Sequence, residues 1–276
     1  MQNNSALNVI HPNAKIGKNV TISPFVTVEE NVEIGDNCWI GPNACILSGV
    51  RMGNDCKVFP GAIVGAAPQD LKFSGEESIV EIGNHVTIRE YCTINRGTKA
   101  NFKTYIGDHS LIMAYVHVAH DCVIENNVIL ANNVTLAGHI EIGEYAVVGG
   151  LTAVHQFVKI GKHSMIGGGS LVRKCVPPYV KAAREPLSYV GVNSTGLRRR
   201  GFTSEQINQI QDIYRVIFIK KMNVANAMEL LEAEFIDSPE KNEILDFIHK
   251  ADRGIMKGFQ QMYHYNGNGS KARSNF

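Results

Sequence analysis

Aliphatic residues recur every six positions along most of this chain. In the longest unbroken run, such a residue opens twelve consecutive blocks of six. The twelve residues are Ile106, Ile112, Val118, Ile124, Leu130, Leu136, Ile142, Val148, Val154, Ile160, Ile166 and Val172. Nine earlier blocks keep the same count from Ile16 to Val64, and three more open at Ile82, Ile88 and Ile94. This period, with glycine and asparagine at the turns, is typical of a parallel β-helix.

Each block is expected to form a short strand and a turn, so that three blocks make one triangular coil of 18 residues. The aliphatic side chains point into the prism and stack on those of the next coil, because no single coil can bury its own apolar face. Turn residues such as Gly143 supply positive φ angles at the corners. We therefore predict a β-helix, an all-β solenoid, over residues 1–178.

Two polar stretches interrupt the period. Residues 66–78 (AAPQDLKFSGEES) and 99–104 are polar where the prism requires aliphatic side chains. Both are therefore expected to be loops that leave the prism. Such a loop is either a tolerated surface insertion or a place where binding residues collect.

After Pro177 and Pro178 the pattern changes from strands to helices. Residues 179–202 are expected to be an irregular connector. Thr203 to Gln206 then form a capping box, and helical spacing follows, with further helices after Asn223 and Ser238. We predict a small α-helical domain over 203–257 and a mobile tail, rich in glycine and asparagine, over 258–276.

Composition narrows the class of protein. The net charge of +1 gives no overall reason to expect binding to nucleic acid. No apolar run approaches the ~20 residues that span a bilayer, so stable membrane insertion is not expected, and the first residues lack the pattern of a secretion signal. Six cysteines form no CxxC pair. We interpret them as reduced, mostly core residues of a cytoplasmic protein.

The repeat itself brings polar residues together. Adjacent coils lie roughly 4.7–4.9 Å apart, so residues 18 apart share a column. Two neighbouring columns are His120, Gly138 and Gln156, and Asp121, His139 and Phe157. The absence of a side chain at Gly138 is expected to leave room for a ligand beside the imidazole of His120.

A histidine with a carboxylate neighbour and no nearby serine or cysteine nucleophile suits general-base chemistry. The alternative is that His117 and His120 are merely solvated turn residues, but His139 and Gln156 cluster around them. Zinc is a second alternative, as in the gamma-class carbonic anhydrases. That site needs two histidines separated by four residues, and the chain has no such pair, so we expect no metal and no cofactor.

Two further segments invite an interpretation. Arg198, Arg199 and Arg200 form a basic run that is either a solvated patch or a partner for phosphate groups. The three glycines 167–169 are expected at a turn rather than around a phosphate. Flat faces of the prism also expose apolar residues, with Val128, Ile129 and Phe157 expected among them, and self-association would cover these.

Several motifs together resemble one enzyme family, over about residues 10–255. They are Gln69-Asp-Leu-Lys72, His117-Val-Ala-His120-Asp121-Cys122, Leu130-Ala-Asn-Asn133, Leu136-Ala-Gly-His139, Gly149-Gly-Leu-Thr-Ala-Val-His155-Gln156-Phe157, Val176-Pro-Pro-Tyr179, Gly191-Val-Asn193 and Arg198-Arg-Arg-Gly-Phe202. The family is that of the acyl-ACP:UDP-N-acetylglucosamine O-acyltransferases. The resemblance implies a left-handed β-helix, a homotrimer with the active site between two subunits, and transfer of an (R)-3-hydroxyacyl chain from acyl carrier protein to the sugar 3-hydroxyl, the first step of lipid A synthesis.

The resemblance also implies roles for single residues. His120 matches the general base and Asp121 the residue that orients it, while Gln156 and nearby amides would receive the thioester oxygen. The remaining matches are substrate contacts: Gln69, Asp70 and Lys72 in the first loop, His117 and His139 near the sugar and its phosphates, and Asn193, Arg199 and Arg200 at the nucleotide. Gly168 matches a position that limits acyl length, and a glycine there favours a long chain of about 14 carbons or more.

Three positions depart from the family pattern. Asn95 stands where a histidine is frequent, Thr195 where a carboxylate is common, and Pro186 where some members have histidine. Alternative functions are a non-catalytic β-helix trimer that binds partners, the N-acyltransferase that acts later in the same synthesis, and an acetyl-CoA-dependent sugar acetyltransferase. The His120–Asp121 pair argues against the first. The hexads begin near residue 10, where the second would need room for an extra domain, and the third would not need the long groove implied by Gly168.

Overall fold

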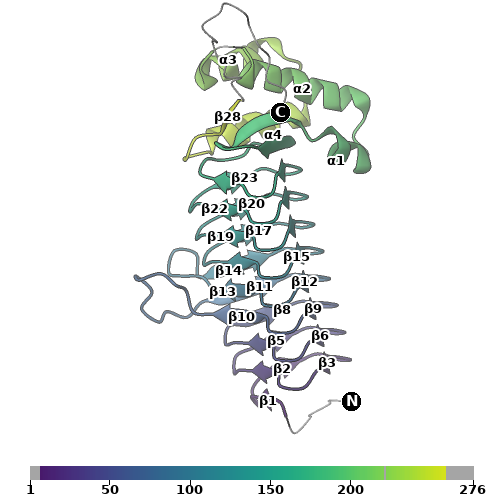
Figure 1. Ribbon diagram of the computed structural model, residues 1–276, viewed down its shortest axis with the longest axis vertical. Coiled ribbons are helices and arrows are strands. Elements are labelled where there is room, and N and C mark those ends of the chain that lie inside the picture. Colours follow the sequence, from purple (N-terminus) through teal and green to yellow (C-terminus); the bar gives the residue numbers. More distant parts are fainter. Residues whose placement is uncertain (1–6, 221, 259–276) are drawn as a thin grey trace, which may run out of the picture.

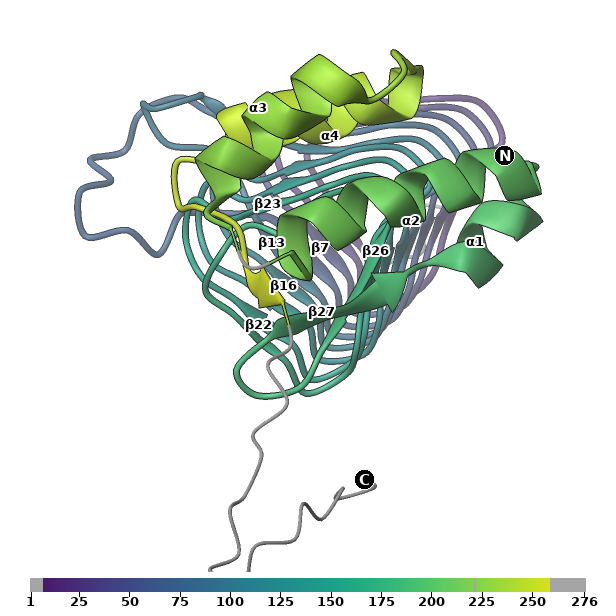
Figure 2. The same cartoon turned by 90° about the horizontal axis from the view of Figure 1, so that it is seen from above.

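The computed structural model describes residues 7–220 and 222–258. Three parallel sheets form the sides of a long triangular prism, and the helices gather at its C-terminal end (Figure 1). Seen from above, the coils lie over one another and the helices cover the end of the stack (Figure 2). One loop projects sideways from the middle of the prism, level with β10, β13 and β14.

Most strands of the three sheets are two residues long and occur once per coil. Sheet A contains β1 (Val9–Ile10), β4 (Thr27–Val28), β7 (Cys45–Ile46), β10 (Ile63–Ala66), β13 (Thr93–Asn95), β16 (His117–Val118), β19 (Thr135–Leu136), β22 (Ala153–Val154) and β25 (Leu171–Val172). Sheet B contains β2 (Lys15–Ile16), β5 (Glu33–Ile34), β8 (Val50–Met52), β11 (Ile79–Ile82), β14 (Lys103–Ile106), β17 (Val123–Ile124), β20 (Glu141–Ile142) and β23 (Lys159–Ile160). Sheet C contains β3 (Thr21–Ile22), β6 (Trp39–Ile40), β9 (Lys57–Val58), β12 (Thr87–Ile88), β15 (Leu111–Ile112), β18 (Ile129–Leu130), β21 (Val147–Val148), β24 (Met165–Ile166), β26 (Val180–Ala183), β27 (Ser188–Val192) and β28 (Lys257–Gly258).

The core is a set of vertical stacks of aliphatic side chains. In the two-residue strands the second residue points inward, so Ile124 is paired with Ile142, and Ile142 with Ile160, on successive coils. All three are buried. The predicted six-residue period is therefore confirmed as the register of the prism. The fifth residue of each block fills the remaining space, and the cysteines at these places, Cys38, Cys56, Cys92 and Cys122, are free and buried.

Most corners of the prism hold one residue in the left-handed backbone region. Gly143 was expected to supply such an angle, but Tyr145 does so at that corner, with φ of 59°. At the corner between sheets A and B the left-handed residues include Asp121, His139 and Phe157, with φ of 59°, 60° and 63°. Backbone bonds join the columns, since His139 N donates to the carbonyl of His120 at 3.1 Å. The side chain of each corner residue is therefore held directly above the one on the coil below.

The first interruption begins one residue later than predicted, because Ala66 belongs to β10 and residues 67–78 separate β10 from β11. The second interruption ends two residues earlier than predicted, at residue 102. Lys103 and Thr104 belong to β14, where they pair with Ile79 and Val80 of β11. Thr104 is buried, so a polar residue takes an inward place that the pattern assigned to a loop. The segment that leaves the prism is 96–102.

The prediction of an irregular connector over 179–202 is wrong. Strands β26 and β27 pair antiparallel and extend sheet C beyond β24. They are followed by helix α1 (Ser194–Arg199). These strands no longer keep the six-residue count, so the pattern that revealed the prism could not reveal them.

Three longer helices follow α1, and their caps are those predicted. Thr203 closes a capping box ahead of α2 (Ser204–Phe218), Asn223 caps α3 (Val224–Glu234), and Ser238 caps α4 (Pro239–His249). The fully buried Tyr214 of α2 donates to the carbonyl of Pro178 at 2.6 Å and fixes the helices to the end of the prism. Within residues 7–220 and 222–258, no helix is long and apolar enough to cross a membrane. Gly258 lies in β28, and the rest of the predicted tail, 259–276, is outside the described residues.

The outer faces of the prism differ in charge. The outward residues of sheet B are mostly ionised: Lys15, Glu33, Arg51, Glu81, Tyr105, Val123, Glu141 and Lys159. The outward residues of sheet C in its upper half are apolar: Leu111, Ile129, Val147 and Met165. Phe157 is exposed as expected, but Val128 is not, because it occupies an inward fifth place and is fully buried.

The stacked core predicts a sharp contrast between neighbouring residues of β20. Ile142→Ala is expected to lower the free energy of unfolding by about 2–5 kcal/mol, because it leaves a cavity in a close-packed stack. Glu141→Ala is the matched control, since its exposed ion pair with Lys159 is worth below about 1 kcal/mol. Urea unfolding followed by far-ultraviolet circular dichroism measures both. Equal losses for the two variants would contradict this account of the core.

Candidate active site

Three of the predicted site residues meet at the corner between sheets A and B. The Nδ1 atom of His120 lies 2.8 Å from Oδ2 of Asp121, and Nε2 of His139 lies 3.8 Å from the same oxygen. The two imidazole rings meet edge to face, with centroids 5.0 Å apart. His120 and Asp121 are 5% and 2% exposed, so the pair is almost entirely removed from solvent.

The carboxylate of Asp121 is fixed by hydrogen bonds from the second interruption of the prism. Its Oδ1 accepts from the backbone N–H of Thr98 at 3.0 Å and of Asn101 at 3.3 Å. Its Oδ2 accepts from the hydroxyl of Thr98 at 2.6 Å. Thr104 holds the backbone of Asp121 by accepting from its N–H at 2.9 Å.

These bonds determine which nitrogen of His120 is available for chemistry. An ionised carboxylate only accepts hydrogen bonds, so Nδ1 of His120 carries the proton that Oδ2 of Asp121 receives. Nε2 of the neutral ring is then the basic nitrogen. The corner therefore presents an oriented imidazole whose free nitrogen can accept a proton.

Gly138 has a more specific role than the sequence suggested. A Cβ at this position would lie 2.4 Å from Cε1 of His120 and 2.7 Å from Nε2. The imidazole of His120 itself therefore fills the space over Gly138. The expectation that this space would admit a ligand beside the ring is wrong. The column geometry was right, and the missing side chain gives the ring its space over the next coil.

Burial favours the neutral form of His117 and His139, the two histidines nearest to His120. Loss of solvent lowers the pKa of His139, although the charges of Asp121 and Asp70 oppose this shift. Its ring stacks on Phe157 at 4.6 Å. Burial also lowers the pKa of His117, whose Nδ1 lies 2.7 Å from the hydroxyl of Thr93. Neutral imidazoles on both sides can donate or accept hydrogen bonds to a polar ligand.

The cluster of His120, Asp121 and His139 has ligand atoms close enough to hold a metal ion. The hydrogen bonds argue for a different use. Both oxygens of Asp121 already receive protein donors, two at Oδ1, and at Oδ2 the hydroxyl of Thr98 and the ring of His120. A metal would have to displace these donors, so the chemistry of this set fits a hydrogen-bonded base better than a metal site.

The first loop brings one of its three predicted residues toward the cluster. Asp70 is close enough for its charge to act on His139, and its side chain accepts from the backbone of Lys72 at 2.9 Å. Gln69 and Lys72 are exposed. Asn95, one of the departures, is buried and donates from its side chain to the carbonyl of Ala67. In this chain, Asn95 therefore anchors the first loop.

Gln156 and Gly168 lie on later coils of the prism. Gln156 is exposed at the A/B corner, on the coil after Gly138. Gly168 is exposed at the corner between sheets C and A, where a Cβ would meet the carbonyl of Gly150 at 3.0 Å. A side chain at Gly168 would thus project from a tightly stacked turn into the space outside the prism.

The predicted nucleotide contacts lie elsewhere on the same chain, at the corner between sheets B and C. Asn193 is buried as the N-cap of α1, where its side chain accepts from Gly196 at 3.3 Å and donates to the carbonyl of His163 at 2.9 Å. The guanidinium of Arg200 lies over the ring of Tyr145, 4.6 Å from its centroid. Arg199 and Thr195 are exposed. One chain does not bring these residues to the His120 corner, because the width of sheet B separates the two corners.

Sequence reasoning missed the residues that support the site. Thr98 fixes Asp121, and Tyr145 holds Arg200. The sequence offered only a weak indication for Thr98, because many polar residues lie beside a break in the six-residue period and nothing singled this one out. Tyr145 stands at a corner position, where aromatic rings alternate with histidine: it stacks on His163 at 5.1 Å, and His163 on Tyr179 at 5.7 Å.

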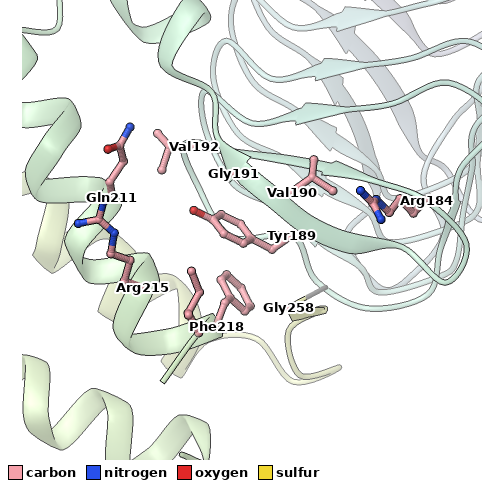
Figure 3. Close-up of a pocket in the computed structure, with 10 residues that line it drawn as sticks. Arg184, Tyr189, Val190, Gly191, Val192, Gln211, Arg215, Phe218 and Gly258 are labelled. Atoms are coloured by element: carbon pink, nitrogen blue, oxygen red, sulfur yellow. The ribbon is translucent and has the colours of Figure 1, made fainter. Parts of the chain in front are cut away.

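A cavity of about 410 Å³ lies apart from these residues, between β27 and α2 (Figure 3). Its lining includes Tyr189, Gly191, Arg215 and Phe218. None of the predicted site residues lines it. This cavity is therefore separate from the candidate active site at the A/B corner.

Comparisons with known proteins agree with this geometry. A family model described as UDP N-acetylglucosamine O-acyltransferase, domain 2, matches residues 176–256. A model described as bacterial transferase hexapeptide (six repeats) matches 103–138, and one described as GMPPB C-terminal domain matches 5–104.

Two solved structures share nearly the whole fold. LpxA, a UDP-N-acetylglucosamine acyltransferase from Bacteroides fragilis, is 49% identical with a TM-score of 0.90, over 92% of this chain and 99% of that one. LpxA from Acinetobacter baumannii is 38% identical with a TM-score of 0.89, over the same shares. The predicted left-handed β-helix with C-terminal helices is thereby confirmed.

Two curated relatives carry the same name. The acyl-(acyl-carrier-protein)–UDP-N-acetylglucosamine O-acyltransferase of Thiobacillus denitrificans is 41% identical over 195 residues, 70% of this chain and 76% of that protein. The protein of the same name from Burkholderia orbicola is 40% identical over 201 residues, 71% of this chain and 77% of that protein. The chain therefore belongs to the family of acyl-(acyl-carrier-protein)–UDP-N-acetylglucosamine O-acyltransferases.

Proposed function

We propose that this protein transfers an (R)-3-hydroxyacyl chain from acyl carrier protein to the 3-hydroxyl of UDP-N-acetylglucosamine, the first step of lipid A synthesis, in the cytoplasm. The observation that carries the proposal is the buried His120, whose Nδ1 is fixed by Asp121 at 2.8 Å and whose Nε2 is the basic nitrogen. Membership of the family supplies the substrates, since the relatives are named for this donor and this acceptor.

The chemistry requires one proton to move twice. Nε2 of His120 takes the proton of the sugar hydroxyl as its oxygen forms a bond to the thioester carbon. The negative charge that develops on the thioester oxygen is received by Gln156 and neighbouring backbone amides. When the carbon–sulfur bond breaks, the imidazolium returns the proton to the departing thiolate. Asp121 holds the ring in the required tautomer throughout.

The remaining predicted residues bind the two substrates in this proposal. Asp70 holds the 3-hydroxyl of the acyl chain, with Gln69 and Lys72 beside it on the same loop. His117 and His139 contact the sugar and its phosphates. Gly168 leaves the acyl groove open at the C/A corner, where its missing side chain admits a long chain.

We further propose a homotrimer, because a single chain leaves its site incomplete. Sheet B is charged, whereas the C/A corner carries Phe25, Tyr91, Tyr115 and Leu151, each more than half exposed. If three such corners meet at a threefold axis, sheet A of one copy faces sheet C of the next, and sheet B faces solvent. The A/B corner of one copy then lies beside the B/C corner of its neighbour. This arrangement brings His120 next to the Asn193, Arg199 and Arg200 of a second copy.

A transfer assay tests the proposal directly. Purified protein, UDP-N-acetylglucosamine and (R)-3-hydroxyacyl carrier proteins of different lengths are expected to yield the O-acylated sugar nucleotide, read by mass spectrometry. His120→Ala is expected to lower kcat by ~10²–10⁴-fold, the usual loss for a general base.

His249→Ala is the matched control, since His249 is exposed in the last turn of α4, where it lies 3.7 Å from Glu232 and away from the prism corners. Sedimentation velocity is expected to report a species of three 30.3-kDa chains for the wild type and both variants. A fully active His120→Ala trimer would remove His120 from the mechanism.

The metal alternative has its own test. Both oxygens of Asp121 accept hydrogen bonds from Thr98 and are therefore not expected to bind a metal ion. Incubation with EDTA followed by gel filtration is thus expected to leave the rate of acyl transfer unchanged. Loss of activity that zinc restores would establish His120, Asp121 and His139 as a metal site instead.

Arg200 provides a test of nucleotide recognition. Its guanidinium is held over Tyr145 and donates to the carbonyl of Gly196 at 3.2 Å. Arg200→Ala is expected to raise KM for the nucleotide sugar by about tenfold while kcat changes less, the loss typical of a charged hydrogen bond used in ground-state binding. An unchanged KM with reduced kcat would place Arg200 in the chemical step.

A further inference from the structure

The two interruptions of the prism are joined to each other beside the active site. Segment 96–102 contacts the 67–78 loop on one side and Asp121 on the other. The backbone N–H of Arg96 donates at 3.0 Å to the carbonyl of Ala66, the last residue of β10 before the loop. Within the loop, Oε1 of Glu76 accepts from the N–H of Lys99 at 3.0 Å. The guanidinium of Arg96 lies 5.6 Å from the ring centroid of Phe73 in the same loop.

Glu76 is the centre of this junction. Its Oε2 accepts from the backbone N–H of Ser74 at 2.9 Å and from the hydroxyl of Ser74 at 3.2 Å. Backbone hydrogen bonds, that of Ser74 first, lower the pKa of Glu76 to about 2. The carboxylate is therefore ionised throughout the neutral range, and its bond to Lys99 is charge-assisted.

Thr98 makes the contact on the other side. Its hydroxyl and its N–H bind the two oxygens of Asp121, at 2.6 and 3.0 Å, and its side chain is 6% exposed. Thr98 and Lys99 are neighbours in the chain. Two consecutive residues thus hold the carboxylate of the catalytic pair and the loop that carries Asp70.

We propose that Thr98 is a positioning residue that sets the proton affinity of the His120–Asp121 pair, and that Glu76 links the 67–78 loop to it through Lys99. The first part requires only the geometry of the pair. The second part rests on the proposed function, because it assigns the loop to recognition of the acyl donor.

The direction in which the titration midpoint of His120 should move follows because two donors share one oxygen of Asp121. Oδ2 of Asp121 receives both the hydroxyl of Thr98 and Nδ1–H of His120. Without the hydroxyl, more of the negative charge faces the imidazole, and the protonated ring becomes more stable. The other titratable groups near His120 are His117 and His139, with Asp70 acting on His139 from the loop. Within the described residues Thr98 makes no hydrogen bond to any of these, so a shift reports its contact with Asp121.

The first experiment follows the imidazole itself. Protein labelled with ¹³C at histidine Cε1 is titrated by NMR, with the His120 signal identified by its loss in His120→Gln. Thr98→Val, which keeps the shape but removes the hydroxyl, is expected to raise the titration midpoint of His120 by about half a pH unit or more. The acid limb of kcat/KM is expected to move in the same direction.

Two controls separate this role from simple stability. Thr98→Ser retains the hydroxyl and is expected to titrate like the wild type. Thr152→Val removes another buried threonine hydroxyl, one that donates to the carbonyl of Gly167 at 3.3 Å, and is expected to leave His120 unmoved. An unchanged His120 titration in folded Thr98→Val would overturn the role of Thr98.

The link through Glu76 is tested by a double-mutant cycle. Glu76→Ala is expected to raise KM for the acyl carrier protein substrate by about tenfold, from loss of a charged hydrogen bond, whereas exposed Glu77→Ala is expected to behave as the wild type. In the double variant with Thr98→Val, the loss in kcat/KM should be smaller than the product of the single losses. If the loss in kcat/KM of the double variant equals the product of the two single losses, the 67–78 loop and the His120–Asp121 pair act independently.

The readouts distinguish the two levels of the proposal. The NMR titration needs no substrate, so a protein that transfers no acyl group but shows the shift would contradict the proposed function and support the role of Thr98. Normal acyl transfer with an unshifted His120 titration in Thr98→Val would support the proposed function and contradict the role of Thr98.

Discussion

Vertical stacking of aliphatic side chains is the constraint on which the rest of the structure depends. Each two-residue strand buries one side chain and pairs with strands on the coils above and below, so Ile124, Ile142 and Ile160 support one another. This regular core fixes the corner positions to within the spacing of adjacent coils. The rigid corners in turn hold His120, Asp121 and His139 in contact without any contribution from the C-terminal helices.

The chemistry depends on places where the regular repeat is relaxed. Asp121 adopts a left-handed backbone conformation at a corner, and Thr104 occupies an inward place that would otherwise be aliphatic. Segment 96–102 leaves the prism and returns hydrogen-bond donors to the carboxylate. A perfect repeat would have no buried polar partners for Asp121. The interruptions supply them, and the surrounding stacks offset the strain and the cost of burying a charge.

Much of this arrangement could be predicted from the sequence, because a fixed period converts residue number into position. Counting in eighteens placed His120 over Gly138 and Asp121 beside His139 correctly. It could not show that the imidazole fills the space over Gly138, since that depends on a side-chain torsion. Nor could it find Thr98, whose position is set by a segment outside the period, or the strands β26 and β27, which follow a different register. The separation of Arg200 from His120 was also hidden, because motifs give residue types and not the corner on which each one lies.

The place of the His120 corner along the prism also bears on how the molecule opens. A solenoid loses structure most easily from its ends, where each coil has a neighbour on one side only. At the N-terminal end of the described prism the first coil is already loosely covered, because its inward residues Ile10, Ile16 and Ile22 are only partly buried. His120 and Asp121 lie many coils away, between fully buried stacks that continue in both directions. Fraying of the first coils therefore leaves the contacts of His120 and Asp121 intact, and the length of the prism confines local unfolding to coils remote from the candidate site.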